Sequence, residues 1–236
     1  MRTDAGLDCL AAPPLRGWPA RQAQLVNRIK RAALRQLHAS AAGERLLLRM
    51  YLIGEEATEV ALQKELIGTR PAWLSRQMDA HLADEQRHAA AFAAALAERG
   101  ALHRPSAPDW LSRRKIAQWQ RLASRHAGQF ASGVLVPAFA IGLCAEQMAT
   151  RVLQRHCALI GPRHCLHPLL AGVLADEDRH VRLCGHTLAR MVAPRERPAL
   201  ATLLGEIRAI ERAHGVTGAL GMYLAGLALR LLPARP

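Results

Sequence analysis

The chain of 236 residues contains few of the residues from which sheets and disulfide frameworks are built. Aromatic residues make up only 4% of it, and β-branched residues are scarce beside Ala and Leu. This shortage excludes an all-β sandwich or barrel, because sheets depend on such side chains. The five cysteines are an odd number and form no C-x-x-C pair, and no apolar signal segment begins the chain. We therefore expect a reducing, cytoplasmic compartment.

Acidic residues are also few, at 19 against 32 Lys and Arg, which gives a formal charge of +13. Such a surface attracts tRNA, an acidic carrier protein or anionic lipid headgroups, without choosing among them. Long hydrophobic runs are missing as well, because no stretch reaches the roughly 18–20 apolar residues that span a bilayer. We expect no transmembrane segment, while peripheral membrane contact and a homo-oligomer stay open.

Half of the chain is apolar and dominated by Ala and Leu, which favours helices. We predict an irregular leader over residues 1–19 and a single helical domain over residues 20–232. Prolines and glycines divide this domain, with Pro71 opening one helix and Gly100 closing it. The helices are expected at about 20–39, 44–67, 71–100, from a cap at 106–109 to 126, 129–159, 168–193, 196–213 and 216–231. The predicted fold class is all-α, a helical bundle.

A short polar sequence occurs twice. Residues 82–88 (LADEQRH) recur as residues 174–180 (LADEDRH), with six of seven positions identical. A helix with a glutamate precedes each copy: Glu55 lies 30 residues before Glu85, and Glu146 lies 31 residues before Glu177. The chain is therefore predicted to contain two helical hairpins, each with a Glu followed by Glu-x-x-His.

This pattern predicts a buried metal centre. Residues three apart share one helix face, so Glu85 with His88, and Glu177 with His180, form two pairs of metal ligands. Apolar neighbours place these helices in the core, where unpaired carboxylates cost several kcal/mol each. Two divalent cations carry +4, which neutralises four glutamates. The predicted ligands are Glu55, Glu85, His88, Glu146, Glu177 and His180.

Over residues 44–192 the pattern resembles the ferritin-like di-iron carboxylate superfamily, whose fold is a four-helix bundle. Residues 84–88 and 176–180 both match D-E-x-R-H, as in the hydroxylase subunits of bacterial multicomponent monooxygenases and in acyl-carrier-protein desaturases. The helices predicted before residue 44 and after residue 192 are additional to this bundle. The resemblance implies two iron ions, or a mixed Mn/Fe pair. It also implies that the motif Asp orients the ligand His of the opposing helix and that the motif Arg joins this network. The residues concerned are Asp84, Asp176, Arg87 and Arg179.

The resemblance further implies a non-haem di-iron oxygenase or hydroxylase that activates O2 to oxidise a small or carrier-bound organic substrate. The chain is far smaller than the two families named, and nearer in size to tRNA-modifying di-iron hydroxylases, which are one alternative. Another alternative is a ferritin-like ferroxidase or peroxide-scavenging protein. Because the sequence has no G-x-G-x-x-G or P-loop, electrons are expected from an external ferredoxin or flavin reductase.

Two residues near the first glutamate leave alternatives open. Glu59 lies one turn after Glu55 on the same face and could replace it or add a carboxylate. Tyr51 lies one turn before Glu55. It could donate a hydrogen bond to the ligands, be an oxidisable residue, or be a core tyrosine. A separate segment with His or Cys at positions 156, 157, 164, 165 and 167 matches no common zinc spacing, and we expect no second metal site there.

Overall fold

The computed structural model describes residues 8–65, 70–101 and 110–231. Within this part of the chain every regular element is a helix, as predicted from the Ala- and Leu-rich composition. The α-helices are α1 (Gly17–Leu37), α2 (Ala41–Glu65), α3 (Ala72–Ala97), α4 (Trp110–His126), α5 (Leu135–Ile160), α6 (His167–Met191) and α7 (Arg197–Leu231). Short 3-10 helices are η1 (Asp8–Leu10), η2 (Ala127–Gln129) and η3 (Pro194–Glu196). The expected end of the second helix at 67 and the expected cap at 106–109 lie outside the described residues.

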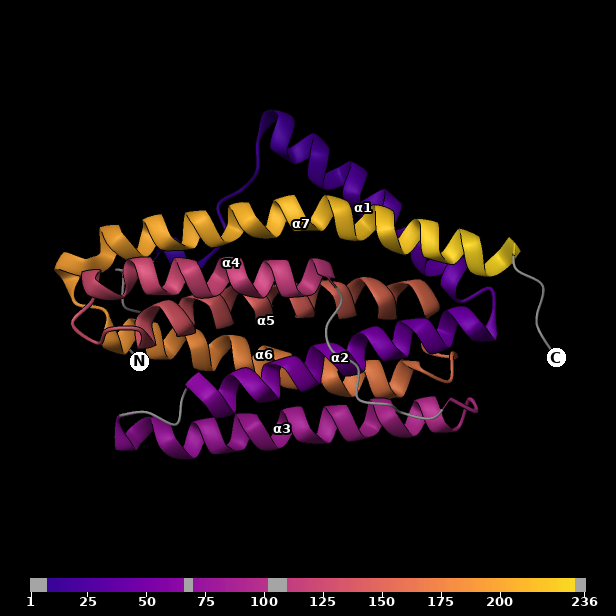
Figure 1. Ribbon diagram of the computed structural model, residues 1–236, viewed down its shortest axis with the longest axis horizontal. Helices are drawn as coiled ribbons and strands as arrows, with labels where there is room; N and C mark the ends of the chain where they lie inside the picture. Colours follow the sequence, from indigo (N-terminus) through magenta and orange to yellow (C-terminus); the bar gives the residue numbers. More distant parts are fainter. Residues whose placement is uncertain (1–7, 66–69, 102–109, 232–236) are drawn as a thin grey trace.

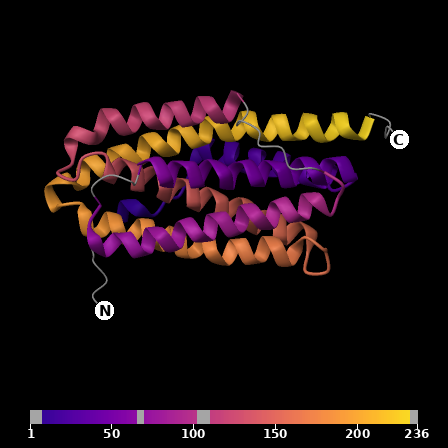
Figure 2. The same cartoon turned by 60° about the horizontal axis from the view of Figure 1, so that its bottom comes forward.

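The two predicted hairpins are the central feature of the fold. Helix α2 packs against α3, and α5 packs against α6, while α3 also contacts α6. Figures 1 and 2 show these four helices side by side with their axes nearly parallel or antiparallel. Turns with left-handed glycines end two of the helices, since Gly100 has φ +68° after α3 and Gly161 has φ +73° after α5.

The remaining helices cover the side of α5 that faces away from α3. Helix α7 runs along α4, α5 and α1, and Figure 1 shows it spanning the long dimension of the molecule. No described helix is both long enough and apolar enough to cross a membrane. The C-terminal half of α7 leaves an apolar stripe exposed, formed by Leu220, Leu224, Leu227 and Leu231.

Several helix boundaries differ from those expected. Helix α1 begins at Gly17, inside the expected irregular leader, and α5 begins at Leu135 instead of 129 because residues 130–134 form turns around Gly133, which has φ +59°. The two short C-terminal helices expected at 196–213 and 216–231 form one helix, α7. Helix α7 packs on α1, α4 and α5, and this packing outweighs glycine's low helix propensity.

Two apolar clusters lie in the core of the hairpin pair, one at each end, and a third, smaller cluster joins α1 to α2. One cluster joins the start of α3 and α5 to the end of α6 and to α7, and includes Met78, Leu143 and Cys184. The other joins the end of α3 and α5 to the start of α6, and includes Phe92 and Leu153. A buried polar layer lies between these two clusters, on α2, α3, α5 and α6.

Candidate metal centre

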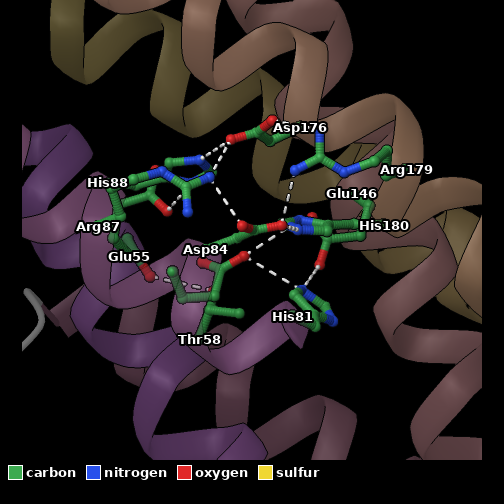
Figure 3. A network of polar contacts seen from close by, with 12 residues as sticks. Glu55, Thr58, His81, Asp84, Arg87, His88, Glu146, Asp176, Arg179 and His180 are labelled. Atoms are coloured by element: carbon green, nitrogen blue, oxygen red, sulfur yellow. Dashed lines mark hydrogen bonds and ion pairs between the residues drawn. The ribbon is translucent and has the colours of Figure 1, made fainter. Parts of the chain in front are cut away.

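Seven acidic and histidine side chains make up this polar layer. They come from all four hairpin helices and point toward one another, as Figure 3 shows for those it labels. Six of the seven are the residues predicted as ligands from the repeat. The layer consists of Glu55 on α2, His81, Glu85 and His88 on α3, Glu146 on α5, and Glu177 and His180 on α6.

Burial of this layer is nearly complete. The exposed fraction lies between 2% and 6% for its residues on α3, α5 and α6, and the Glu55 side chain is 11% exposed. Four carboxylates in such surroundings repel one another and lose their hydration, which costs several kcal/mol per uncompensated charge. The layer therefore favours the binding of cations or protons.

The side chains form two groups. Within each group, the candidate ligand atoms all lie within 4.8 Å of one another. In the first group, Nε2 of His81 is 3.1 Å from Oε1 of Glu85 and 3.4 Å from Oε1 of Glu146. Nδ1 of His180 completes this group, 3.2 Å from the same Glu85 oxygen. Each group combines residues of both hairpins, so the layer exists only once the hairpins have packed.

The second group joins Glu55, His88 and Glu177. Nδ1 of His88 lies 3.5 Å from Oε2 of Glu55. This group has one imidazole and two carboxylates, whereas the first has two imidazoles and two carboxylates. The two positions are therefore related by the repeat but differ in one nitrogen donor.

An outer layer of aspartates and arginines fixes the two motif histidines. Oδ2 of Asp176 lies 3.0 Å from Nε2 of His88, and Oδ2 of Asp84 lies 3.2 Å from Nε2 of His180. Each aspartate thus contacts the histidine of the opposite hairpin, which is the juxtaposition that the D-E-x-R-H resemblance implies. The contact places the proton on Nε2 and turns Nδ1 toward the glutamates.

The motif arginines link the two aspartates to each other. Arg87 donates to both Asp84 and Asp176, and Arg179 donates to the same two carboxylates, 2.9 Å from Oδ2 of Asp84. Two positive charges therefore face two negative charges, and the outer layer is neutral overall. Burial works against ionisation of Asp176, but hydrogen bonds from His88 and both arginines outweigh it and lower its pKa to about 2.

The pKa values of the buried glutamates show how strongly they compete for protons. Burial and repulsion by Glu85 raise the pKa of Glu55 to about 7, although His88 opposes the shift. Burial and repulsion by Glu146 raise the pKa of Glu177 far above its ordinary value. Burial also acts to raise the pKa of Glu85, but hydrogen bonds from His180 and His81 outweigh it and lower that pKa. Metal-free protein therefore retains protons on some of these carboxyl groups.

Histidine protonation follows the same pattern. Burial lowers the pKa of His81, but Glu146 and Glu85 more than compensate and raise it to about 9. In metal-free protein His81 is therefore a buried cation that partly balances the two carboxylates. A metal cation could take over this role, because it would replace the proton with a larger charge.

Buried nitrogen and oxygen atoms without hydrogen-bond partners make this set of side chains suitable for binding metal ions. Among the described residues, Nδ1 of His88 and Oε2 of Glu177 are buried and make no hydrogen bond, and Nδ1 of His180, 3.2 Å from Oε1 of Glu85, makes no well-aligned one. Such atoms are rare in folded proteins unless a ligand satisfies them. Because these atoms belong to the two groups of carboxylates and imidazoles, the polar layer can hold metal ions.

Two residues that the sequence left open lie apart from the groups. A carboxylate oxygen of Glu59 accepts hydrogen bonds from Gln63 and Gln86, each 3.0 Å long. The hydroxyl of Tyr51 lies 2.9 Å from Nδ1 of His156, and its ring stacks on Phe92. The structure therefore brings Glu55 into the second group, whereas Glu59 and Tyr51 contact other partners.

His81 is the functional candidate that the sequence reasoning missed. It lies four residues before Glu85 and seven before His88, so all three share one face of α3. This spacing was a usable signal, but the repeat obscured it, because the matching position in the second copy is Val173.

Searches against protein-family models, curated proteins and solved structures return no match to this chain.

Proposed function

We propose that the buried layer holds two iron ions and that the protein is an O2-dependent oxidoreductase of the di-iron hydroxylase type. One observation carries the proposal: four carboxylates and three imidazoles from two related hairpins converge, with buried donor atoms left free. Mixed oxygen and nitrogen donors suit iron or manganese better than zinc, which favours sulfur or more histidine. A Glu and a Glu-x-x-His from each half of a helical bundle is the ferritin-like ligand set.

In this proposal each group of side chains holds one ion. Glu55, His88 and Glu177 hold one, and the other is held by His81, Glu85, Glu146 and His180. When bound, ferrous ions would supply electrons for the reduction of O2, the chemistry needed to oxidise a C–H or N–H bond. A mixed Mn/Fe pair is compatible with the same donors.

The residues around the proposed ligands orient them and exclude water, and they do not react themselves. Asp176 and Asp84 hold the ligand histidines by Nε2, so that the Nδ1 atoms are oriented before a metal arrives. The apolar clusters on either side, which include Phe92 and Cys184, restrict the access of water. Exclusion of water protects a reactive oxidant from side reactions.

Electrons and substrate come from partners in this proposal. The donor is a ferredoxin or a flavin reductase, and the organic substrate is free, attached to an acidic carrier protein, or part of a tRNA. The formal charge of +13 supports an acidic partner, because it attracts negatively charged macromolecules.

The first test is metal analysis after anaerobic reconstitution with Fe(II). Wild type is compared with Glu85→Ala and Glu177→Ala, and Glu59→Ala is the matched control on the same bundle. We expect two irons per chain in wild type and in Glu59→Ala, and a loss of iron in the other two variants. Equal iron in all four proteins would refute the proposed centre.

The second test separates a hydroxylase from the alternative, a ferritin-like ferroxidase. O2 consumption by the reconstituted protein is followed with an electron donor, with and without organic substrates. A hydroxylase consumes O2 in proportion to substrate oxidised. Rapid consumption driven by excess Fe(II) alone, with none coupled to a substrate, would instead support the ferroxidase.

A further inference from the structure

A second cluster of histidines lies at the other end of the bundle from η1, where α1 meets α2 and where α5 meets α6. His38 ends α1, Glu44 lies in the first turn of α2, and His164 lies in the turn between α5 and α6. Nδ1 of His38 is 3.0 Å from Oε1 of Glu44, and Nε2 of His164 is 3.4 Å from the same oxygen. One carboxylate oxygen of Glu44 thus lies between two imidazole nitrogens. The three residues come from three separate segments of the chain.

These distances match those between ligands of one metal ion. Around a tetrahedral cation with bonds of about 2.0–2.1 Å, neighbouring donor atoms lie roughly 3.3 Å apart. The three candidate ligand atoms of His38, Glu44 and His164 all lie within 4.8 Å of one another. A cation could therefore bind with only small side-chain movements.

The atoms of His38 and Glu44 that face away from the cluster are already held. Nε of Arg99 donates to Oε2 of Glu44 over 3.2 Å, which leaves Oε1 to face the imidazoles. Nε2 of His38 lies 2.6 Å from Nε2 of His156, and Nδ1 of His156 lies 2.9 Å from the Tyr51 hydroxyl. Ligand histidines in metal sites characteristically have their second nitrogen fixed by such an outer partner. Nδ1 of His164 accepts the N–H of Leu166 over 3.2 Å and must give up this bond for Nε2 to bind a metal.

His156 is placed to support this arrangement. It is 1% exposed, and its Nε2 faces Nε2 of His38 at 2.6 Å, so it can accept the Nε2 proton of a His38 that binds a metal through Nδ1.

The cluster is open to solution, unlike the buried layer. A surface hollow of about 320 Å³ is lined by His38 and His164, with Arg35 and Ile160 beside them. The side chains of His38, Glu44 and His164 are 12%, 19% and 26% exposed. Cations can reach this site from bulk water, and three protein ligands leave a coordination position for water or another molecule.

We propose that His38, Glu44 and His164 form a second metal site, separate from the buried layer, for a late first-row divalent cation such as Zn2+. Two imidazoles and one carboxylate form a known zinc ligand set that leaves a position open. Imidazole donors bind Zn2+ more tightly than Fe2+, in line with the general order of affinities. The proposal does not depend on the function of the buried layer.

Competition between the protein and a chromophoric chelator for Zn2+ tests this site. The variants are His164→Ala and Glu44→Gln, and the matched control is His167→Ala, which removes a nearby histidine at the start of α6. We expect wild type and His167→Ala to bind one more Zn2+ equivalent than either variant, or to bind that equivalent at least tenfold more tightly.

Far-UV circular dichroism checks that all variants remain folded. His164 is in a surface turn, so its replacement leaves the helices intact even if Glu44→Gln perturbs the start of α2. Equal Zn2+ stoichiometry and affinity in wild type, His164→Ala and His167→Ala would overturn the proposal. Loss of Zn2+ from His167→Ala as well as from His164→Ala would also overturn it, because the segment and not the cluster would then be responsible.

Discussion

Single residues in the outer layer decide which histidine nitrogen faces the buried glutamates. Asp176 and Asp84 each reach across to a histidine of the other hairpin, and the arginines of both motifs neutralise them. The arrangement is reciprocal, so the two hairpins are joined by the residues that orient the ligands. If the layer holds metal, as proposed, we expect folding and metal binding to be coupled through these individual hydrogen bonds.

Asp176→Asn tests this coupling. The asparagine keeps the shape of the side chain but loses the charge that holds His88 and pairs with Arg87. We expect metal affinity at the second group to fall by about 10–100-fold, which is typical when an outer partner of a ligand is changed. Chelator competition measures the affinity, and the exposed Asp178→Asn on the same helix is the control. Equal affinities in the two variants would contradict the proposed orienting role.

His81→Val tests the asymmetry of the buried layer, because valine is the residue at the matching position of the repeat, Val173. Only the first group contains His81, so we expect one of two metal equivalents to bind at least tenfold more weakly and the other to be unaffected. Anaerobic Fe(II) titration distinguishes the two equivalents. His186→Val, an exposed histidine on α6, should bind both as in wild type. An equal loss of both equivalents in His81→Val would show that the groups do not bind independently.

At the scale of helices, the sequence predicts most of the arrangement because the signals are local. Pro71 and Gly100 bracket α3, and the repeat marks α3 and α6 as equivalent halves of two hairpins. The break expected near Gly215 does not occur, because local propensity is outweighed by the packing of α7 on α1. Turns around Gly133 likewise delay the start of α5, and the sequence pattern does not show this.

The site is predictable to a similar extent. Repeated Glu-x-x-His and its distance from Glu55 and Glu146 reveal six members of the buried layer, since helix periodicity places them on one face. His81 breaks the repeat and so escapes this reasoning. The sequence analysis expects no second metal site in the segment that contains His164, and the proposed site reverses that expectation. The segment alone has no zinc spacing, and His38 and Glu44 come from other segments that approach it only in the folded chain.

The junction of α1 and α2 is a test at this scale. Ser40 caps α2 by accepting the N–H of Gly43 through its hydroxyl, 3.1 Å away, and the short turn brings His38 to Glu44. A Cβ added at Gly43 would lie 2.1 Å from the carbonyl oxygen of Leu37, so the backbone must shift.

We expect Gly43→Ala to lower the free energy of unfolding by about 1–3 kcal/mol, as overpacking does, and to weaken Zn2+ binding at the second metal site. Gly54→Ala is the matched control on the same helix, where an added Cβ meets nothing within 4 Å. It should raise stability by about 1 kcal/mol, because alanine is the better helix former. Urea denaturation followed by circular dichroism measures both, and a Gly43→Ala protein as stable as wild type would rule out the close approach.

For the whole molecule, the polar layer makes stability depend on what occupies it. The layer lies between the two apolar clusters, so water cannot hydrate its charged groups unless the hairpins separate. Glu177 and His81 have folded-state pKa values raised above their ordinary values of 4.5 and 6.5, the latter to about 9. The folded metal-free chain therefore holds more protons between pH 7 and 9 than the unfolded chain does.

A group with a raised pKa in the folded state loses its stabilising contribution as pH rises through that pKa. The free energy of unfolding of the EDTA-treated protein should therefore fall between pH 7 and 9, by on the order of 2 kcal/mol. Bound metal displaces these protons, so the metal-loaded protein should not show this fall and its stability advantage should grow with pH. Urea denaturation at pH 7, 8 and 9, with and without metal, measures both trends, and Glu177→Gln should flatten the slope of the metal-free protein. A metal-free protein whose stability is constant or rises over this range would show that the layer does not retain its protons when the chain is folded.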